Sequence, residues 1–116
     1  MKYKALALDL DGTLTDSEKK VPQGNKEAIA RAIDAGVKVI LASGRPIFGI
    51  TPIAEELELD KKGGYILAYN GGCIVDFKTG EQMAATIMPQ DCIADICSLA
   101  RANGVYALTY ADTQIA

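Results

Sequence analysis

Two short apolar runs, residues 3–10 and 37–42, flank a stretch with helical periodicity, and this alternation constrains the fold more than any other feature. Each run, YKALALDL and VKVILA, has the length of a buried strand and ends at a polar turn. Between the runs, four apolar residues share one helical face: Ala28, Ile29, Ala32 and Ile33. Gly36 stands where a helix C-terminal glycine is expected, which predicts a helix over 25–35. Strand, helix and strand in this order predict a right-handed βαβ unit.

The βαβ pattern continues with a second helix and a third strand. Thr51 fits an N-cap and Pro52 the first helical position, so we expect the second helix over 51–59. Residues 65–69, YILAY, predict the third strand, which closes on an Asn-Gly-Gly turn.

The pattern changes after Gly72. We expect a hairpin there, formed by strands over residues 73–77 and 83–87. A helix over 91–103 and a strand over 105–110 are expected after it. The predicted fold class is therefore α/β, with a Rossmann-like parallel sheet in residues 1–71 and a separate α+β region in residues 72–116.

Composition excludes several classes of function. Apolar residues make up 49% of the 116 and charged residues 23%, a balance that supports a packed core rather than disorder. The net charge is -3 and the basic residues are scattered, which argues against nucleic acid as a partner. No apolar run approaches the ~20 residues of a membrane span, and the opening residues do not resemble a signal peptide. We expect no membrane partner and a cytoplasmic location.

Histidine is absent, and the three cysteines form no Cys-x-x-Cys pair. A Ser-His-Asp or Cys-His nucleophile, a His-rich zinc site and a disulfide framework are therefore excluded or disfavoured. Any chemistry must depend on carboxylates and a hard cation.

The first candidate site follows the first strand, at Asp9, Asp11, Gly12 and Thr13. Two carboxylates two residues apart project to the same side of an extended backbone and repel each other unless a cation lies between them. Mg²⁺ prefers such oxygen ligands, and the amides around Gly12 and Thr13 can form a nest for phosphate oxygens. The alternative, a strand end and a capped turn, carries about equal weight for an isolated Asp-x-Asp-Gly.

Two further candidates follow the second and third strands. Ser43 and Gly44 offer a hydroxyl and an amide to a phosphate, and the parallel strands would bring them to the same sheet edge as the carboxylates. Taken alone, this motif favours an ordinary loop by about two to one, and its combination with the first motif reverses that preference. Arg45 is equally consistent with a partner for a substrate anion and with a solvated surface charge. Asn70 belongs to a common turn dipeptide and is included because of its position at the same edge.

These motifs together resemble a known family. DLDGTLTD, residues 9–16, resembles the first signature motif of the haloacid dehalogenase (HAD) superfamily. LASGRP, residues 41–46, resembles its second motif in the form found in Cof-type sugar-phosphate phosphatases, and Asn70-Gly71-Gly72 looks like the segment leading from the Rossmann-like core into the cap. The resemblance extends over essentially the whole chain, with 72–116 as the beginning of the cap.

The resemblance implies a Mg²⁺-dependent phosphatase, a hydrolase of small phosphomonoesters such as sugar phosphates. Asp9 would be the nucleophile that forms an aspartyl-phosphate, and Asp11 the acid for the leaving oxygen and then the base for water. Mg²⁺ would lie between Asp9 and a phosphoryl oxygen, with the backbone carbonyl of Asp11 as a further ligand, and Ser43 would hydrogen-bond the phosphoryl group.

The chain also departs from the family pattern. Members carry a third motif with a lysine and a fourth with an Asp pair on strands after the cap, and neither is found here. We therefore expect an incomplete catalytic site and, because the first strand is central in the family's sheet, an exposed apolar edge through which this chain self-associates. The alternatives are a non-catalytic Mg²⁺- or phosphate-binding α/β module, for which a receiver domain fits poorly, and a purely structural domain.

Overall fold

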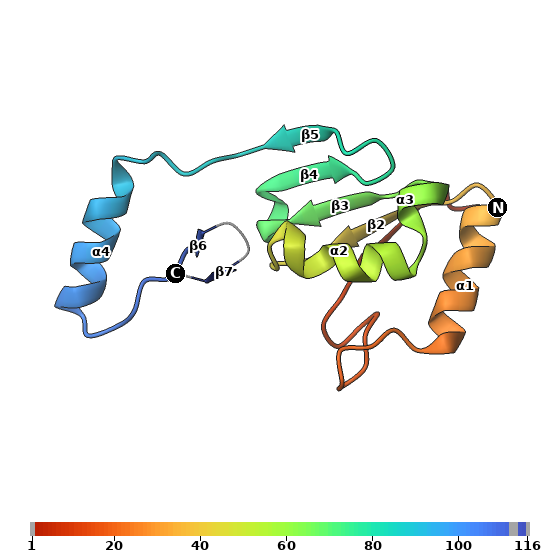
Figure 1. Ribbon diagram of the computed structural model, residues 1–116, viewed down its shortest axis with the longest axis horizontal. Coiled ribbons are helices and arrows are strands. Elements are labelled where there is room, and N and C mark those ends of the chain that lie inside the picture. Colours follow the sequence, from red (N-terminus) through yellow and green to blue (C-terminus); the bar gives the residue numbers. More distant parts are fainter. Residues whose placement is uncertain (1, 112–113, 116) are drawn as a thin grey trace. The chain divides into compact units, whose positions relative to one another are not determined.

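The computed structural model describes residues 2–111 and 114–115 (Figure 1). Its contacts divide the chain into two compact units, Met1–Thr86 and Ile87–Ala116. Each unit is described by itself.

A five-stranded sheet organises the first unit, in the order β1-β2-β3-β4-β5 (Figure 1). The strands are β1 (Ala5–Asp9), β2 (Lys38–Ala42), β3 (Tyr65–Ala68), β4 (Cys73–Asp76) and β5 (Gln82–Ala85). The first three pair in parallel, and the last two pair antiparallel. This arrangement confirms the α/β class with a parallel Rossmann-like sheet, and it adds the predicted hairpin to the same sheet.

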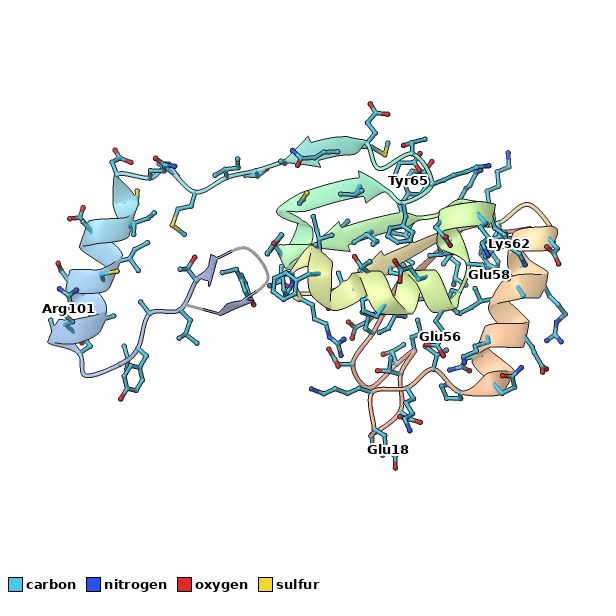
Figure 2. The ribbon with its side chains drawn as sticks, viewed as in Figure 1. Glu18, Glu56, Glu58, Lys62, Tyr65 and Arg101 are labelled. Atoms are coloured by element: carbon cyan, nitrogen blue, oxygen red, sulfur yellow. The ribbon has the colours of Figure 1, made fainter. Side chains whose placement is uncertain are left out.

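Three helices connect the parallel strands: α1 (Gln23–Asp34), α2 (Ile47–Glu56) and the short α3 (Leu59–Lys62). The core lies between these helices and one face of the sheet, where the buried side chains include Ile29, Val39, Leu41, Ile50, Ile53, Ile66 and Ala68. Alternation along the strands places Ile40 and Leu67 on the opposite face, where they are only half-buried. An ion pair between Lys26 of α1 and Glu56 of α2 joins two helices on the covered face. Figure 2 labels Glu56.

The predicted glycine at the end of α1 is confirmed. Gly36 has a φ of 87°, in the left-handed region that a side chain disfavours. Its amide donates to the carbonyl of Ile33 at 2.9 Å, and the Val37 amide donates to that of Ala32 at 3.0 Å, a pair that closes the helix.

The predicted start of the second helix was wrong. Helix α2 begins at Ile47, directly after Pro46, and Pro52 lies inside it. Proline removes one backbone hydrogen bond, but the helix buries Ile50, Ile53 and Ala54 against the sheet, which offsets that loss. The Thr51 hydroxyl caps nothing; it donates to the Ile47 carbonyl one turn back, at 2.9 Å.

The second unit contains helix α4 (Cys92–Ala102) and the two-residue strands β6 (Tyr110–Ala111) and β7 (Gln114–Ile115). The helix confirms the prediction for 91–103. The predicted strand over 105–110 was wrong for residues 105–109, which have no regular structure, because a strand needs a partner and β6 finds one only from Tyr110. The domain boundary at Gly72 stays a prediction.

Across residues 2–111 and 114–115, no helix has both the length and the apolar character to cross a membrane.

Candidate functional site

The carboxyl ends of the three parallel strands bring the predicted site residues to one edge of the sheet. Asp9 is opposite Ala42, and Ala42 is opposite Leu67. The loops that follow these three strands therefore start side by side, and they carry Asp11, Ser43 and Asn70. This is the edge at which parallel α/β sheets bind ligands.

The loop after β1 is a tight turn around one carbonyl oxygen. The carbonyl of Leu10 accepts hydrogen bonds from the amides of Thr13, Leu14 and Thr15, at 3.0 to 3.2 Å, and from the Thr15 hydroxyl at 2.9 Å. Gly12, with a φ of 78°, allows the reversal. These hydrogen bonds fix the backbone of the turn that contains Asp11, whose side chain is exposed.

Backbone hydrogen bonds join the loop after β2 to the loop after β3. The Asn70 amide donates to the Ser43 carbonyl at 3.1 Å, and the Tyr69 amide donates to the Arg45 carbonyl at 3.0 Å. A Cβ at Gly44 would lie 3.0 Å from the Asn70 Oδ1 atom, so a glycine lets the two loops approach. Asn70 itself adopts a left-handed backbone, with a φ of 55°.

Ser43 is buried at this junction, and its hydroxyl oxygen accepts a hydrogen bond from the Arg45 amide at 3.1 Å. This bond uses an acceptor site of the hydroxyl group and does not use its hydrogen, which is a donor. A phosphoryl oxygen at the sheet edge is an acceptor of the right kind.

Arg45 forms an ion pair with Asp11. Its Nε atom donates to Asp11 Oδ2 at 3.0 Å, and a terminal nitrogen donates to Oδ1, which gives the two-pronged geometry of guanidinium and carboxylate. The other terminal nitrogen donates to the Gly49 carbonyl at 3.1 Å and so fixes the guanidinium to α2. The Arg45 side chain is 23% exposed, so it is not a freely solvated charge.

Charge and hydrogen bonding at the pair act on both groups. The hydrogen bond from Arg45 lowers the pKa of Asp11 below its ordinary value; burial opposes this effect, and the charges of Arg45 and Lys19 add to it. The same hydrogen bond raises the pKa of Arg45. Asp11 is therefore ionised in this arrangement and accepts protons poorly.

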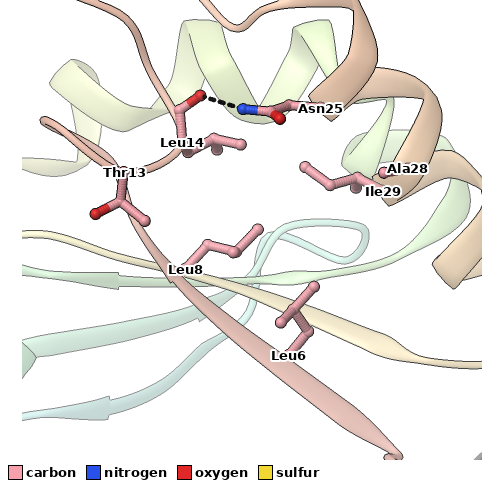
Figure 3. A pocket seen from close by; sticks show the side chains of 7 residues that line it. All are labelled: Leu6, Leu8, Thr13, Leu14, Asn25, Ala28 and Ile29. Atoms are coloured by element: carbon pink, nitrogen blue, oxygen red, sulfur yellow. Dashed lines mark hydrogen bonds between the residues drawn. The ribbon is translucent and has the colours of Figure 1, made fainter.

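Thr13 belongs to the same turn as Asp11 and Gly12, and its side chain lines a groove. The groove lies between β1 and α1, and Leu6 and Leu8 also line it (Figure 3). Its phosphate-binding role stays a prediction, as do the roles of the other site residues.

The oxygen-rich donor set fits a hard cation in type. Asp9 has an exposed carboxylate at the end of β1, and the backbone carbonyl of Asp11 follows in the same turn. Mg²⁺ completes its six ligands with water and substrate oxygens, so two protein ligands are compatible with it. Within the part of the chain that the structure describes, no three His, Cys, Asp or Glu side chains gather as a full cage.

Sequence reasoning missed the bond between Arg45 and Gly49 and the pairing of Arg45 with Asp11. The two partners of the ion pair are 34 residues apart, and the sequence contains no signal that joins them. The Gly49 contact had a weak signal, since a glycine four residues after the arginine allows close approach once α2 begins at Ile47.

Comparison with known proteins gives a family match over residues 6–116, to haloacid dehalogenase-like hydrolase. The 5-amino-6-(5-phospho-D-ribitylamino)uracil phosphatase of Bacillus subtilis is 34% identical over 113 residues, covering 97% of this chain and 37% of that protein. The pyridoxal phosphate phosphatase of Escherichia coli is 30% identical over 112 residues, covering 97% of this chain and 40% of that protein.

Among solved structures, a haloacid dehalogenase-like hydrolase from Bacteroides thetaiotaomicron is similar, with a TM-score of 0.89 and 42% sequence identity. The match covers 98% of this chain and 43% of that one. The chain thus spans about two fifths of the length of the proteins it matches.

Proposed function

This chain belongs to the haloacid dehalogenase-like hydrolase family, and we propose that it supplies the nucleophile region of a phosphatase for small phosphorylated metabolites. The observation that carries the proposal is the meeting of Asp9, Ser43 and the Asp11–Arg45 pair at one sheet edge. The names of two relatives, which include a phosphorylated uracil derivative and pyridoxal phosphate, support the substrate class.

Asp9 is the proposed nucleophile. Its carboxylate is exposed at the end of β1, and a carboxylate is one of the side-chain groups that form covalent intermediates in enzymes. Attack forms a bond between a carboxylate oxygen and phosphorus as the bond to the leaving oxygen breaks, giving an aspartyl-phosphate that water then hydrolyses. Ser43 donates a hydrogen bond to the phosphoryl group, and Gly44 and Asn70 line the site beside it.

Asp11 is the proposed acid and base, and Arg45 controls when it acts. While the guanidinium holds both carboxylate oxygens, Asp11 stays ionised and cannot protonate a leaving oxygen. A phosphate group is an equally suitable partner for the guanidinium fork, so substrate binding would compete for Arg45 and release Asp11.

Mg²⁺ is the proposed cofactor, held by the Asp9 carboxylate and the Asp11 carbonyl. When bound, it neutralises charge that develops on the transferring phosphoryl group. The three free cysteines, Cys73, Cys92 and Cys97, are consistent with the reducing cytoplasm as the proposed location.

The test measures phosphate release from p-nitrophenyl phosphate with Mg²⁺ or EDTA, by this chain and by a version extended to the length of its relatives. Asp9→Asn should abolish release wherever wild type is active. Asp16→Asn is the matched control: the carboxylate of Asp16 accepts hydrogen bonds from the amides of Glu18 and Lys20 within its own loop, and its loss should leave release unchanged.

Activity that needs Mg²⁺ and Asp9 would support the proposal. Activity retained by Asp9→Asn would remove Asp9 as the nucleophile. No release by either version would favour a non-catalytic module that binds Mg²⁺ and phosphate.

A further inference from the structure

Two consecutive residues at the candidate site, Tyr69 and Asn70, have left-handed backbones, and we call them the left-handed pair. Their φ values are 52° and 55°, and Gly71 follows with a φ of 94°. Asparagine tolerates this conformation, but for a bulky residue such as tyrosine it is uncommon and costs free energy. Such a backbone persists only where its surroundings hold it, and residues of this kind cluster at functional sites. The contacts of the left-handed pair therefore indicate what its conformation does.

The left-handed pair interrupts the parallel ladder between β2 and β3. The ladder reaches Ser43, whose amide donates to the Leu67 carbonyl at 3.0 Å. In a regular parallel ladder the Ser43 carbonyl would then accept from the Tyr69 amide, two residues further along the chain. It accepts instead from the Asn70 amide at 3.1 Å, and the Tyr69 amide donates to the Arg45 carbonyl at 3.0 Å. The pair thus directs two consecutive amides to the loop after β2.

These contacts fix the loop segment 43–45, which carries the buried Ser43 hydroxyl. The Arg45 amide donates to Ser43 Oγ at 3.1 Å, so the position of the Arg45 peptide group sets that of the hydroxyl oxygen. Gly44, between the two, lies so close to the Asn70 side chain that a Cβ would be 3.0 Å from its Oδ1 atom. Each residue of the segment is therefore held by Tyr69 or by Asn70.

We propose that Asn70 is a positioning residue for Ser43: its left-handed backbone, and not a contact of its side-chain amide with phosphate, holds the serine hydroxyl in place. The inference rests on the proposed function for the role of Ser43, whereas the contacts between the two loops stand without it. Glycine at position 70 would keep the left-handed backbone and lose the side-chain amide. Alanine would lose the amide and also disfavour the backbone, so the two substitutions separate the two roles.

The first measurement compares Asn70→Gly with Asn70→Ala in this chain, by hydrogen exchange of the Arg45 amide. That amide reports the position of the hydroxyl because it donates to Ser43 Oγ. We expect its exchange to be about three- to tenfold faster in Asn70→Ala, and as slow as in wild type in Asn70→Gly. Exchange of the Leu41 amide, within β2, checks that each variant is folded.

Glu58 provides the matched control. It also has a left-handed backbone, with a φ of 58°, but it lies before α3, at the end of the sheet where β3 begins (Figure 2). Glu58→Ala should therefore leave exchange of the Arg45 amide as it is in wild type. Equal acceleration in Asn70→Gly and Asn70→Ala would assign the effect to the side chain and overturn the proposal. Wild-type exchange in a folded Asn70→Ala variant would overturn it too.

The second measurement separates kcat from KM for p-nitrophenyl phosphate, in the version extended to the length of the relatives. A displaced Ser43 hydroxyl weakens a hydrogen bond to the transferring phosphoryl group. Asn70→Ala should therefore lower kcat by about three- to tenfold with KM nearly unchanged, and Asn70→Gly should keep the wild-type kcat. A raised KM in both variants would indicate phosphate binding by the side chain and refute the proposal. No release even by the wild type would contradict the proposed function, while the exchange of the Arg45 amide would still decide the positioning role.

Discussion

Helices α1 and α4 have similar length and a similar amphipathic pattern, yet they end in different environments. Helix α1 has 12 residues and buries Ile29 against the sheet, while α4 has 11 residues and buries none. On α4, Ile93, Ile96 and Leu99 are 53%, 41% and 66% exposed. The periodic pattern therefore accounts for helix formation in both units, but the apolar face contributes stability only where a sheet covers it.

The largest expected effect comes from matched leucine truncations in the two units. Leu41 on β2 is fully buried, so Leu41→Ala should lower the free energy of unfolding of the first unit by about 2–5 kcal/mol. Leu99→Ala should change it by less than about 0.5 kcal/mol, because Leu99 is exposed. Hydrogen exchange of the β2 and β3 amides reports the stability of that unit. An equal loss of unfolding free energy in both variants would contradict the difference in burial between the two units.

A smaller effect is expected from the glycines that end the two helices. Gly36 and Gly104 both have positive φ, 87° and 66°, and both follow the last turn of their helix. Gly36→Ala should destabilise the first unit by about 1–2 kcal/mol, the cost of a left-handed backbone for a residue with a Cβ. Gly104→Ala carries the same local cost, but it should leave exchange in β2 and β3 unchanged.

The outcome for Gly104 decides whether the units unfold separately. If Gly104→Ala accelerated exchange in β2 and β3 as much as Gly36→Ala, the two units would share one cooperative transition.

The sequence was most informative where local signals and burial agree. The apolar runs of β1 and β2 and the terminal glycine of α1 located the first βαβ unit, because strand burial and helix closure follow from a few neighbouring residues. It was misleading at Thr51 and Pro52, which fit a helix start but lie inside α2. There the burial of Ile50 and Ile53 outweighs a local preference, and that term depends on contacts that are distant in sequence.

The candidate site divides in the same way. The positions of Asp9, Ser43 and Asn70 at one edge follow from parallel strand order, which a sequence can indicate. The pairing of Arg45 with Asp11 does not, because it depends on how two loops approach and on the Gly49 carbonyl that holds the guanidinium. The residues of the candidate site could be predicted from the sequence, whereas the contacts between their side chains could not.

The smallest expected effect concerns that ion pair, compared with a charge of the second unit. The pKa of Asp11 is lowered in the folded chain. The ion pair therefore stabilises the first unit at pH values above the ordinary aspartate pKa, near 3.8. This contribution is lost as the pH falls through the lower folded value. Arg45→Gln should therefore destabilise the first unit at neutral pH, by about 0.5 kcal/mol or less because Asp11 is exposed, and have no effect in stronger acid.

Arg101, in the last turn of α4, provides the control (Figure 2). Arg101→Gln removes the same charge without touching Asp11, so it should leave the pH dependence of exchange in the first unit as it is in wild type. Carbon-13 NMR of the Asp11 carboxyl group gives the direct readout: its pKa should rise toward the ordinary value in Arg45→Gln and stay low in Arg101→Gln. A pKa that stayed low in both variants would show that Arg45 does not control the ionisation of Asp11, and the proposed release of Asp11 by substrate would lose its physical basis.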